Sequence, residues 1–268
     1  MKKNNRSVLT VITALMVLFA YADFSFAFHV NRGVKKYHDS CNNGVGNIDD
    51  CSLLGSLYYE GAKVRQNYEQ AFKFSKMACD KDAASGCYIL GQLYSFDRFV
   101  ESNKTIAFEY FSLACNKGNH GAACLELARN HRRNGDIGKA VSYTEKACGG
   151  GNAKGCTMAG GHYYSAIKKS KNTKRDFVKS FRLYGKACDL DDIVGCMSYA
   201  RMFVYGLGVE ASEESAKKYY GKACDLEVKF WKMRRSACEE YDGLEQRLER
   251  LRKSYYKGKN ITSNSQRY

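Results

Sequence analysis

Residues 71–94, AFKFSKMACDKDAASGCYILGQLY, carry the pattern that decides the fold. Ala71, Phe74 and Ala78 precede Cys79 by eight, five and one residues. These spacings place two small residues and one aromatic residue on a single face of a helix that ends near the cysteine. Small residues let a second helix approach closely, and the aromatic ring fills the space between the two helices.

A second helix is predicted from Cys87 onward. Gly91 and Tyr94 follow this cysteine by four and seven residues, which again places a small and an aromatic residue on one face. The segment between the two cysteines is charged or small and includes Gly86, as in a tight turn. The stretch therefore predicts two antiparallel helices joined by a short turn.

The same pattern recurs along the chain. The first cysteine of each pair returns every 33 to 40 residues, a period typical of a helical-hairpin solenoid. His131 takes one of the recurring aromatic positions and is predicted to pack in the core. The chain contains no proline, which also favours helices joined by glycine turns. The twelve cysteines form six consecutive pairs: Cys41 and Cys51, Cys79 and Cys87, Cys115 and Cys124, Cys148 and Cys156, Cys188 and Cys196, and Cys224 and Cys238.

Each cysteine pair is predicted to form a local disulfide. A helix–turn–helix brings residues eight apart within disulfide reach, whereas in one continuous helix they would lie about 12 Å apart. Zinc sites and thiol oxidoreductases use a C-x2-C spacing, which this sequence lacks. The last pair is the least regular, because residues 227–235 are inserted between Cys224 and Cys238.

Residues 53–71, LLGSLYYEGAKVRQNYEQA, resemble a Sel-one-like repeat, a relative of the tetratricopeptide repeat. Residues 86–94 and 205–209 match the same pattern. With a cysteine pair in every unit, the chain is similar to the Helicobacter cysteine-rich protein family over roughly residues 33–240. The resemblance implies an all-α, right-handed superhelical solenoid of disulfide-stapled helix pairs, whose concave surface binds partners. It also implies an alternative function, that of a weak penicillin-binding protein or slow β-lactamase.

The two ends of the chain differ from the repeats. Residues 1–27 combine a basic start with the apolar run Val8–Ala20, as in a secretory signal peptide, with a membrane anchor as the alternative. The solenoid is predicted over residues 28–256 as an N-terminal half-repeat, about five helix pairs and an amphipathic C-terminal capping helix. Residues 257–268 are expected to form a disordered tail. This organisation predicts a secreted or periplasmic protein without stable membrane insertion.

No recognisable catalytic motif occurs in the sequence. S-x-x-K occurs at Ser165–Lys168 and Ser215–Lys218, but the S-D-N and K-T-G elements of serine β-lactamases are missing. The five histidines are scattered, so no metal site is predicted, and no glycine-rich phosphate loop is present. The sequence leaves an enzyme function open and predicts no cofactor.

The formal net charge of +15 bears on the kind of partner. Because export argues against nucleic acid, the predicted partner is a protein or peptide, or an acidic ligand such as a peptidoglycan-type glycan; β-lactams are the alternative. Lys168–Arg175 forms one basic run, and Glu101–Thr105 resembles a bacterial N-glycosylation acceptor centred on Asn103.

A ligand-binding groove is predicted along the helices that follow each second cysteine. Residues five and eight positions after that cysteine point away from the partner helix. Arginine forks bind carboxylates and phosphates, and tyrosines supply rigid contact area. The predicted groove residues are Tyr59, Gln92, Arg129, Arg132, Tyr164 and Arg201.

Overall fold

The computed structural model describes residues 34–41, 47–165, 176–231 and 236–264. The predicted signal peptide and the basic run Lys168–Arg175 lie outside these residues. Throughout the described ranges the secondary structure is helical, with no strand. The chain divides into two compact units, Met1–Gly118 and Asn119–Tyr268.

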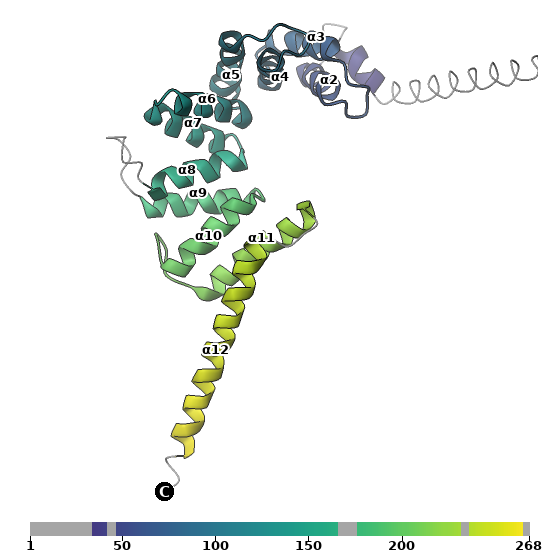
Figure 1. Ribbon diagram of the computed structural model, residues 1–268. Coiled ribbons are helices and arrows are strands. Elements are labelled where there is room, and N and C mark those ends of the chain that lie inside the picture. Colours follow the sequence, from purple (N-terminus) through teal and green to yellow (C-terminus); the bar gives the residue numbers. More distant parts are fainter. Residues whose placement is uncertain (1–33, 42–46, 166–175, 232–235, 265–268) are drawn as a thin grey trace, which may run out of the picture. The chain divides into compact units, whose positions relative to one another are not determined.

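The first unit stacks consecutive helices around an apolar core (Figure 1). A helix over residues 34–41 precedes α2 (Ile48–Glu60), α3 (Tyr68–Cys79), α4 (Ala84–Ser95) and α5 (Lys104–Gly118). Within this unit α2 packs on α3, α3 on α4 and α4 on α5, and α2 also contacts α4. Val34, Leu54 and Phe74 are fully buried in the core at the start of this unit.

The second unit continues the same arrangement (Figure 1). Consecutive helices pack on one another, and α8 also contacts both α6 and α10. This pattern of neighbour and next-but-one contacts is that of an α-solenoid. The helices are α6 (Gly121–Arg133), α7 (Ile137–Gly149), α8 (Ala153–Ser165), α9 (Phe177–Asp189), α10 (Ile193–Tyr205), α11 (Glu213–Trp231) and α12 (Ser236–Asn264).

Disulfides join the end of one helix to the start of the next. Their Cα–Cα distances run from 4.3 to 5.2 Å, and no cysteine among the described residues is free. Cys115 and Cys124 are disulfide-bonded as well. Five predicted pairings are confirmed: Cys41–Cys51, Cys79–Cys87, Cys148–Cys156, Cys188–Cys196 and Cys224–Cys238.

Glycine just before the second cysteine permits the close approach of the two stapled helices. A Cβ atom added there would lie within 2.7 Å of an alanine side chain on the facing helix, closer than real Cβ contacts. The pairs are Gly86 with Ala78, Gly155 with Ala147, and Gly195 with Ala187. The alanine before the first cysteine, predicted as a contact residue, is therefore the surface against which the next helix packs.

The recurring aromatic positions stack on one another. One ring belongs to the residue seven positions after the second cysteine of a pair. It lies parallel to the ring of the residue five positions before the first cysteine of the following pair, and the ring centroids are 5.2 to 5.9 Å apart. The pairs are Tyr58 with Phe74, Tyr94 with Tyr110, His131 with Tyr143, and Phe203 with Tyr219. His131 stacks on Tyr143 at the predicted aromatic position, but it is half-buried and lies near Asp136 rather than being enclosed in the core.

The last helix is longer than the predicted cap. α12 begins at Ser236, so it contains Cys238 and the expected cap in one continuous helix, and it continues to Asn264, past residue 256. The sequence offers no proline to end the helix earlier. Leu244 anchors it, being 4% exposed and packed against Ala200 and Tyr220. In the described part of the chain, no helix has both the length and the apolar character needed to cross a membrane.

Candidate functional site

The two groove residues of the first unit are held by neighbouring side chains. The Tyr59 hydroxyl accepts a hydrogen bond from Arg98 at 3.1 Å, and the same guanidinium lies 5.4 Å from the Tyr59 ring centroid. Gln92 donates to the Tyr88 hydroxyl at 2.9 Å. Both residues therefore take part in contacts within the fold, on α2 and α4 respectively.

The four groove residues of the second unit have different surroundings. Arg129 is paired with Glu126 one turn earlier on α6, which reduces its availability to a ligand. Arg132 is exposed, and the Tyr164 ring lies 5.8 Å from that of Phe177. Arg201 is the one of the four that lines the described pocket.

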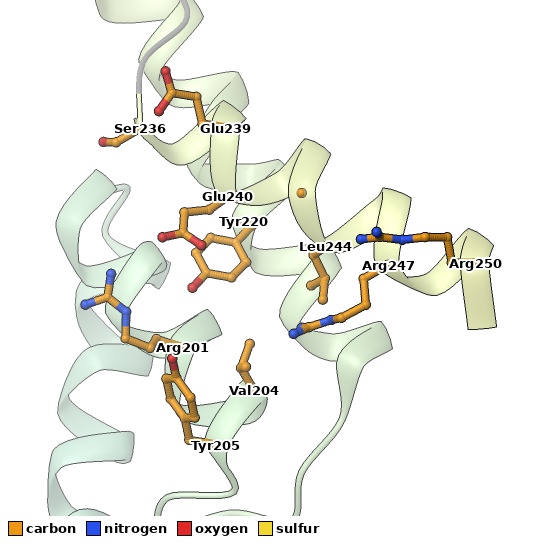
Figure 2. Close-up of a pocket in the computed structure, with 11 residues that line it drawn as sticks. Arg201, Val204, Tyr205, Tyr220, Ser236, Glu239, Glu240, Leu244, Arg247 and Arg250 are labelled. Atoms are coloured by element: carbon orange, nitrogen blue, oxygen red, sulfur yellow. The ribbon is translucent and has the colours of Figure 1, made fainter. Parts of the chain in front are cut away.

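This pocket lies between α10, α11 and α12 and has a volume of about 490 Å³ (Figure 2). α10 contributes Arg201, Val204 and Tyr205, and α11 contributes Tyr220. The remaining wall is formed by residues of α12: Ser236, Glu239, Glu240, Gly243, Leu244, Arg247 and Arg250. The volume lies in the range of pockets that bind small ligands and peptide segments.

A single face of α12 supplies most of this wall. Glu240, Leu244 and Arg247 are spaced four and three residues apart, so they lie above one another on the helix. Leu244 is buried beneath the pocket, whereas Glu240 and Arg247 are exposed to solvent. The packing of Leu244 therefore aims the charged residues of α12 at α10.

The Tyr220 hydroxyl at the pocket is a neutral hydrogen-bonding group. Tyr220 is 3% exposed, and burial, followed by the charge of Glu240, raises the pKa of its hydroxyl. A hydrogen bond from Arg201 acts on this pKa in the opposite direction. The phenol stays protonated at neutral pH, so the site offers hydrogen bonds and charge pairing rather than a general base.

The sequence does not predict the contribution of α12 to this site. It predicts only an amphipathic capping helix there, because no sequence repeat aligns Arg247 and Arg250 with Arg201. The available signal was the spacing of Glu240, Leu244 and Arg247, which places an acidic, an apolar and a basic residue on one face.

The serines of the two S-x-x-K matches make structural hydrogen bonds. Ser165 donates to the carbonyl of Gly161 at 2.8 Å, within its own helix. Ser215 accepts a hydrogen bond from the Ser212 hydroxyl at 2.9 Å, and its amide donates to the same hydroxyl at the start of α11. Among the described residues no cluster of histidine, cysteine and acidic side chains could hold a metal ion.

Asn103, at the centre of the possible glycosylation acceptor, precedes α5. Its side-chain oxygen accepts a hydrogen bond from the Ile106 amide at 3.1 Å, which is a helix N-cap. The residue is exposed in the loop between α4 and α5.

The Sel1 repeat family matches this chain at residues 49–82, 84–119, 122–152, 158–192 and 193–228, more than half of its length. The chain therefore belongs to the Sel1 repeat family, and the predicted resemblance is confirmed. Each matched segment spans the second helix of one stapled pair and the first helix of the next. The disulfides therefore connect successive repeats.

Three known proteins are similar to this chain. Cytochrome c oxidase assembly factor 7A of Xenopus laevis is 29% identical over 188 residues, which cover 66% of this chain and 79% of the relative. A Sel1 repeat protein of Oxalobacter formigenes superposes with a TM-score of 0.58 at 18% identity, covering 72% of this chain and 84% of that one. The cysteine-rich protein B of Helicobacter pylori is 33% identical, covering 47% of this chain and 90% of its own, with a TM-score of 0.37.

Proposed function

We propose that this disulfide-rich Sel1 repeat protein is exported and binds a protein, peptide or cell-envelope ligand through the helices that follow each second cysteine. The observation that carries the proposal is the pocket of about 490 Å³ beside Arg201, which combines arginine, tyrosine and apolar walls. Arginine and tyrosine are the residue types that dominate binding energy at protein interfaces.

The scaffold supports a binding role. Sel1 repeats generally mediate protein interactions. Local disulfides hold successive repeats in this chain, so the exposed residues of each helix are presented on a pre-organised surface, which lowers the entropic cost of binding. Disulfides at successive helix junctions favour an oxidising compartment, which agrees with the proposed export to the periplasm or the exterior.

The test starts by identifying the partner. The oxidised protein is used to capture ligands from envelope and host-cell extracts, and the affinity of the identified partner is then measured with purified components. Replacing both Arg129 and Arg201 with alanine is expected to cost about 1.5–3 kcal/mol for each charged hydrogen bond lost, with thermal stability nearly unchanged. Arg201 should account for the larger share, because Arg129 is already paired with Glu126.

A matched control uses two exposed arginines outside the predicted groove. Arg65 lies between α2 and α3, and Arg182 lies on α9, the helix that carries the first cysteine Cys188. The double change of Arg65 and Arg182 to alanine removes the same formal charge but should leave affinity unchanged. An equal loss of affinity in the two double variants would show that net charge causes the effect, and it would contradict the proposed site.

A further inference from the structure

We propose that the pocket between α10, α11 and α12 binds a short peptide segment that carries a cationic and an anionic group at its two ends. The cation lies against Glu239 and Glu240, and the anion lies against Arg247 and Arg250. This inference rests on the proposed function, because Arg201 belongs to both, and it adds the chemistry and the charge order of the ligand.

The charges that line the pocket are separated along α12. Glu239 lies beside Ser236 at one end of the view, Glu240 lies beside Tyr220 on the side of Arg201, and Arg247 and Arg250 lie at the other end (Figure 2). Glu240 and Arg247 are seven residues apart on one helix face, which corresponds to about 10 Å. A ligand whose cation faces the glutamates and whose anion faces the arginines therefore needs its two charges about 10 Å apart. This is the length of roughly three extended residues.

The charged groups at both ends are exposed to solvent. Glu239 and Glu240 are exposed, and the charge of Glu240 acts on the nearby Tyr220 hydroxyl. Arg247 contacts Glu213 through its Nε at 3.4 Å, which steadies the guanidinium while its terminal nitrogens remain available. Arg250 is exposed on the next turn. Two adjacent guanidinium groups suit a carboxylate, which arginine can bind in a bidentate manner.

The middle of the pocket is apolar and open. Val204 and Leu244 provide the apolar wall between the charged ends (Figure 2). Gly243 lies in the interior of α12, and a Cβ atom added there meets no atom within 4 Å. Glycine in a helix interior costs about 1 kcal/mol relative to alanine. Local packing does not demand this glycine, and its missing side chain leaves space for a ligand.

Mixed charge distinguishes this ligand from a simple anion. The lining residues include three arginines and two glutamates, so a phosphate or a polyanion would meet repulsion at the acidic end. A peptide with a lysine at one end and a glutamate at the other would satisfy both ends and place small apolar side chains against Leu244.

The experiment titrates the oxidised full chain with blocked peptides. In the series, increasing numbers of alanines separate an N-acetylated lysine from an amidated glutamate, and binding is followed by calorimetry and by amide chemical shifts. The peptide whose charges span about 10 Å should bind most tightly. Replacing its lysine with norleucine, or its glutamate with glutamine, should each weaken binding about tenfold or more. The Arg247→Gln, Arg250→Gln double variant should lose the preference for glutamate over glutamine.

Gly243→Leu provides a blocking variant that does not depend on charge. Leucine favours a helix and fills the open space, so peptide binding should disappear while the fold is retained. Gly138→Leu is the matched control on α7, where an added Cβ meets only the Asp136 carboxylate at 3.9 Å, and it should bind the peptides normally. Equal affinity for charged and neutral peptides, unchanged binding to Gly243→Leu, or no saturable binding by any peptide of the series would overturn the inference.

The two proposals fail in distinguishable ways. If the peptides bind and the Arg129, Arg201 double variant keeps its affinity for the identified partner, the proposed groove is wrong and the pocket stands. If no peptide binds while that double variant loses affinity for its partner, the proposed pocket ligand is contradicted and the proposed groove is supported.

Discussion

The carboxylate of Glu227 accepts a hydrogen bond from the backbone amide of Ala237 at 3.1 Å. Glu227 is 5% exposed at the end of α11, and Ala237 is in the first turn of α12. First-turn amides of a helix have no partner within the helix, so the side chain caps α12 across the inserted segment. The insertion that makes the last cysteine pair irregular therefore also supplies the acceptor that secures its second helix.

Removing this cap should loosen the C-terminal helix pair. Glu227→Ala is expected to lower the free energy of unfolding by about 1 kcal/mol, in the range of helix N-caps. Glu227→Gln keeps an acceptor oxygen and should lose less. Denaturant unfolding of the oxidised protein measures both, with Glu239→Ala as an exposed control on α12. An equal loss for Glu227→Ala and Glu239→Ala would show that the cap contributes nothing.

Deleting one staple should cost stability without changing the fold. Replacing Cys188 and Cys196 with alanine opens a loop of sequence separation 8, and the chain-entropy model gives about 2.5 kcal/mol for a loop of this length. The Cys79, Cys87 pair has the same separation, so its removal should cost a similar amount. Denaturant unfolding with circular dichroism makes the comparison. A negligible loss for both pairs would show that helix packing alone holds the repeats together.

Acid should destabilise the protein through histidines that are buried or half-buried. Burial, and then the positive charge of Arg132, lowers the pKa of His162, which is 7% exposed, below its usual 6.5. Burial also lowers the pKa values of His38 and His120. As pH falls, the unfolded histidines take up protons near pH 6.5, before the folded ones do. Their stabilising contribution is therefore complete above about pH 6.5 and is lost as pH falls from there through the lowered folded pKa values.

The test compares wild type with His162→Gln over a pH series from neutral to acidic. The wild type should lose more unfolding free energy than the variant below about pH 6.5, while the difference between them stays constant above it. Circular dichroism at each pH confirms that both remain folded before denaturant is added. Parallel curves across the whole series would contradict the assigned direction of the His162 pKa.

Any β-lactam hydrolysis by this chain should not depend on the S-x-x-K serines. Ser165 and Ser215 make hydrogen bonds that serve their own helices, and the other serine-enzyme elements are missing from the sequence. Replacing each with alanine should leave the rate with a chromogenic cephalosporin unchanged. A large loss of rate in either variant, with normal circular dichroism, would identify a nucleophile.

Export predicts a shortened N-terminus. Cleavage after Ala27 gives Phe28 as the first residue of the mature chain, with Asp23 as the alternative. N-terminal sequencing of the exported protein decides between them. A membrane-bound protein that retains Met1 would instead support the anchor interpretation.

Local sequence patterns predict the helices, their antiparallel pairing and the disulfides, five of which are confirmed with their partners. These features depend on local spacing, because residues such as Ala78, Cys79 and Cys87 are brought together by a turn of a few residues. The sequence also identified the aromatic positions, since Tyr58 and Phe74 recur at fixed offsets from the cysteines.

How these positions meet depends on the packing of the helices. Tyr58 stacks on Phe74 because neighbouring helices approach at an angle and depth set by packing, which no offset along the chain specifies. The pocket arises in the same way. Arg201 and Arg247 lie on separate helices, and the buried Leu244 fixes the rotation of α12 that turns its charged residues toward α10. Burial of apolar surface brings side chains that are distant in sequence to one site. Local sequence patterns therefore do not predict this site.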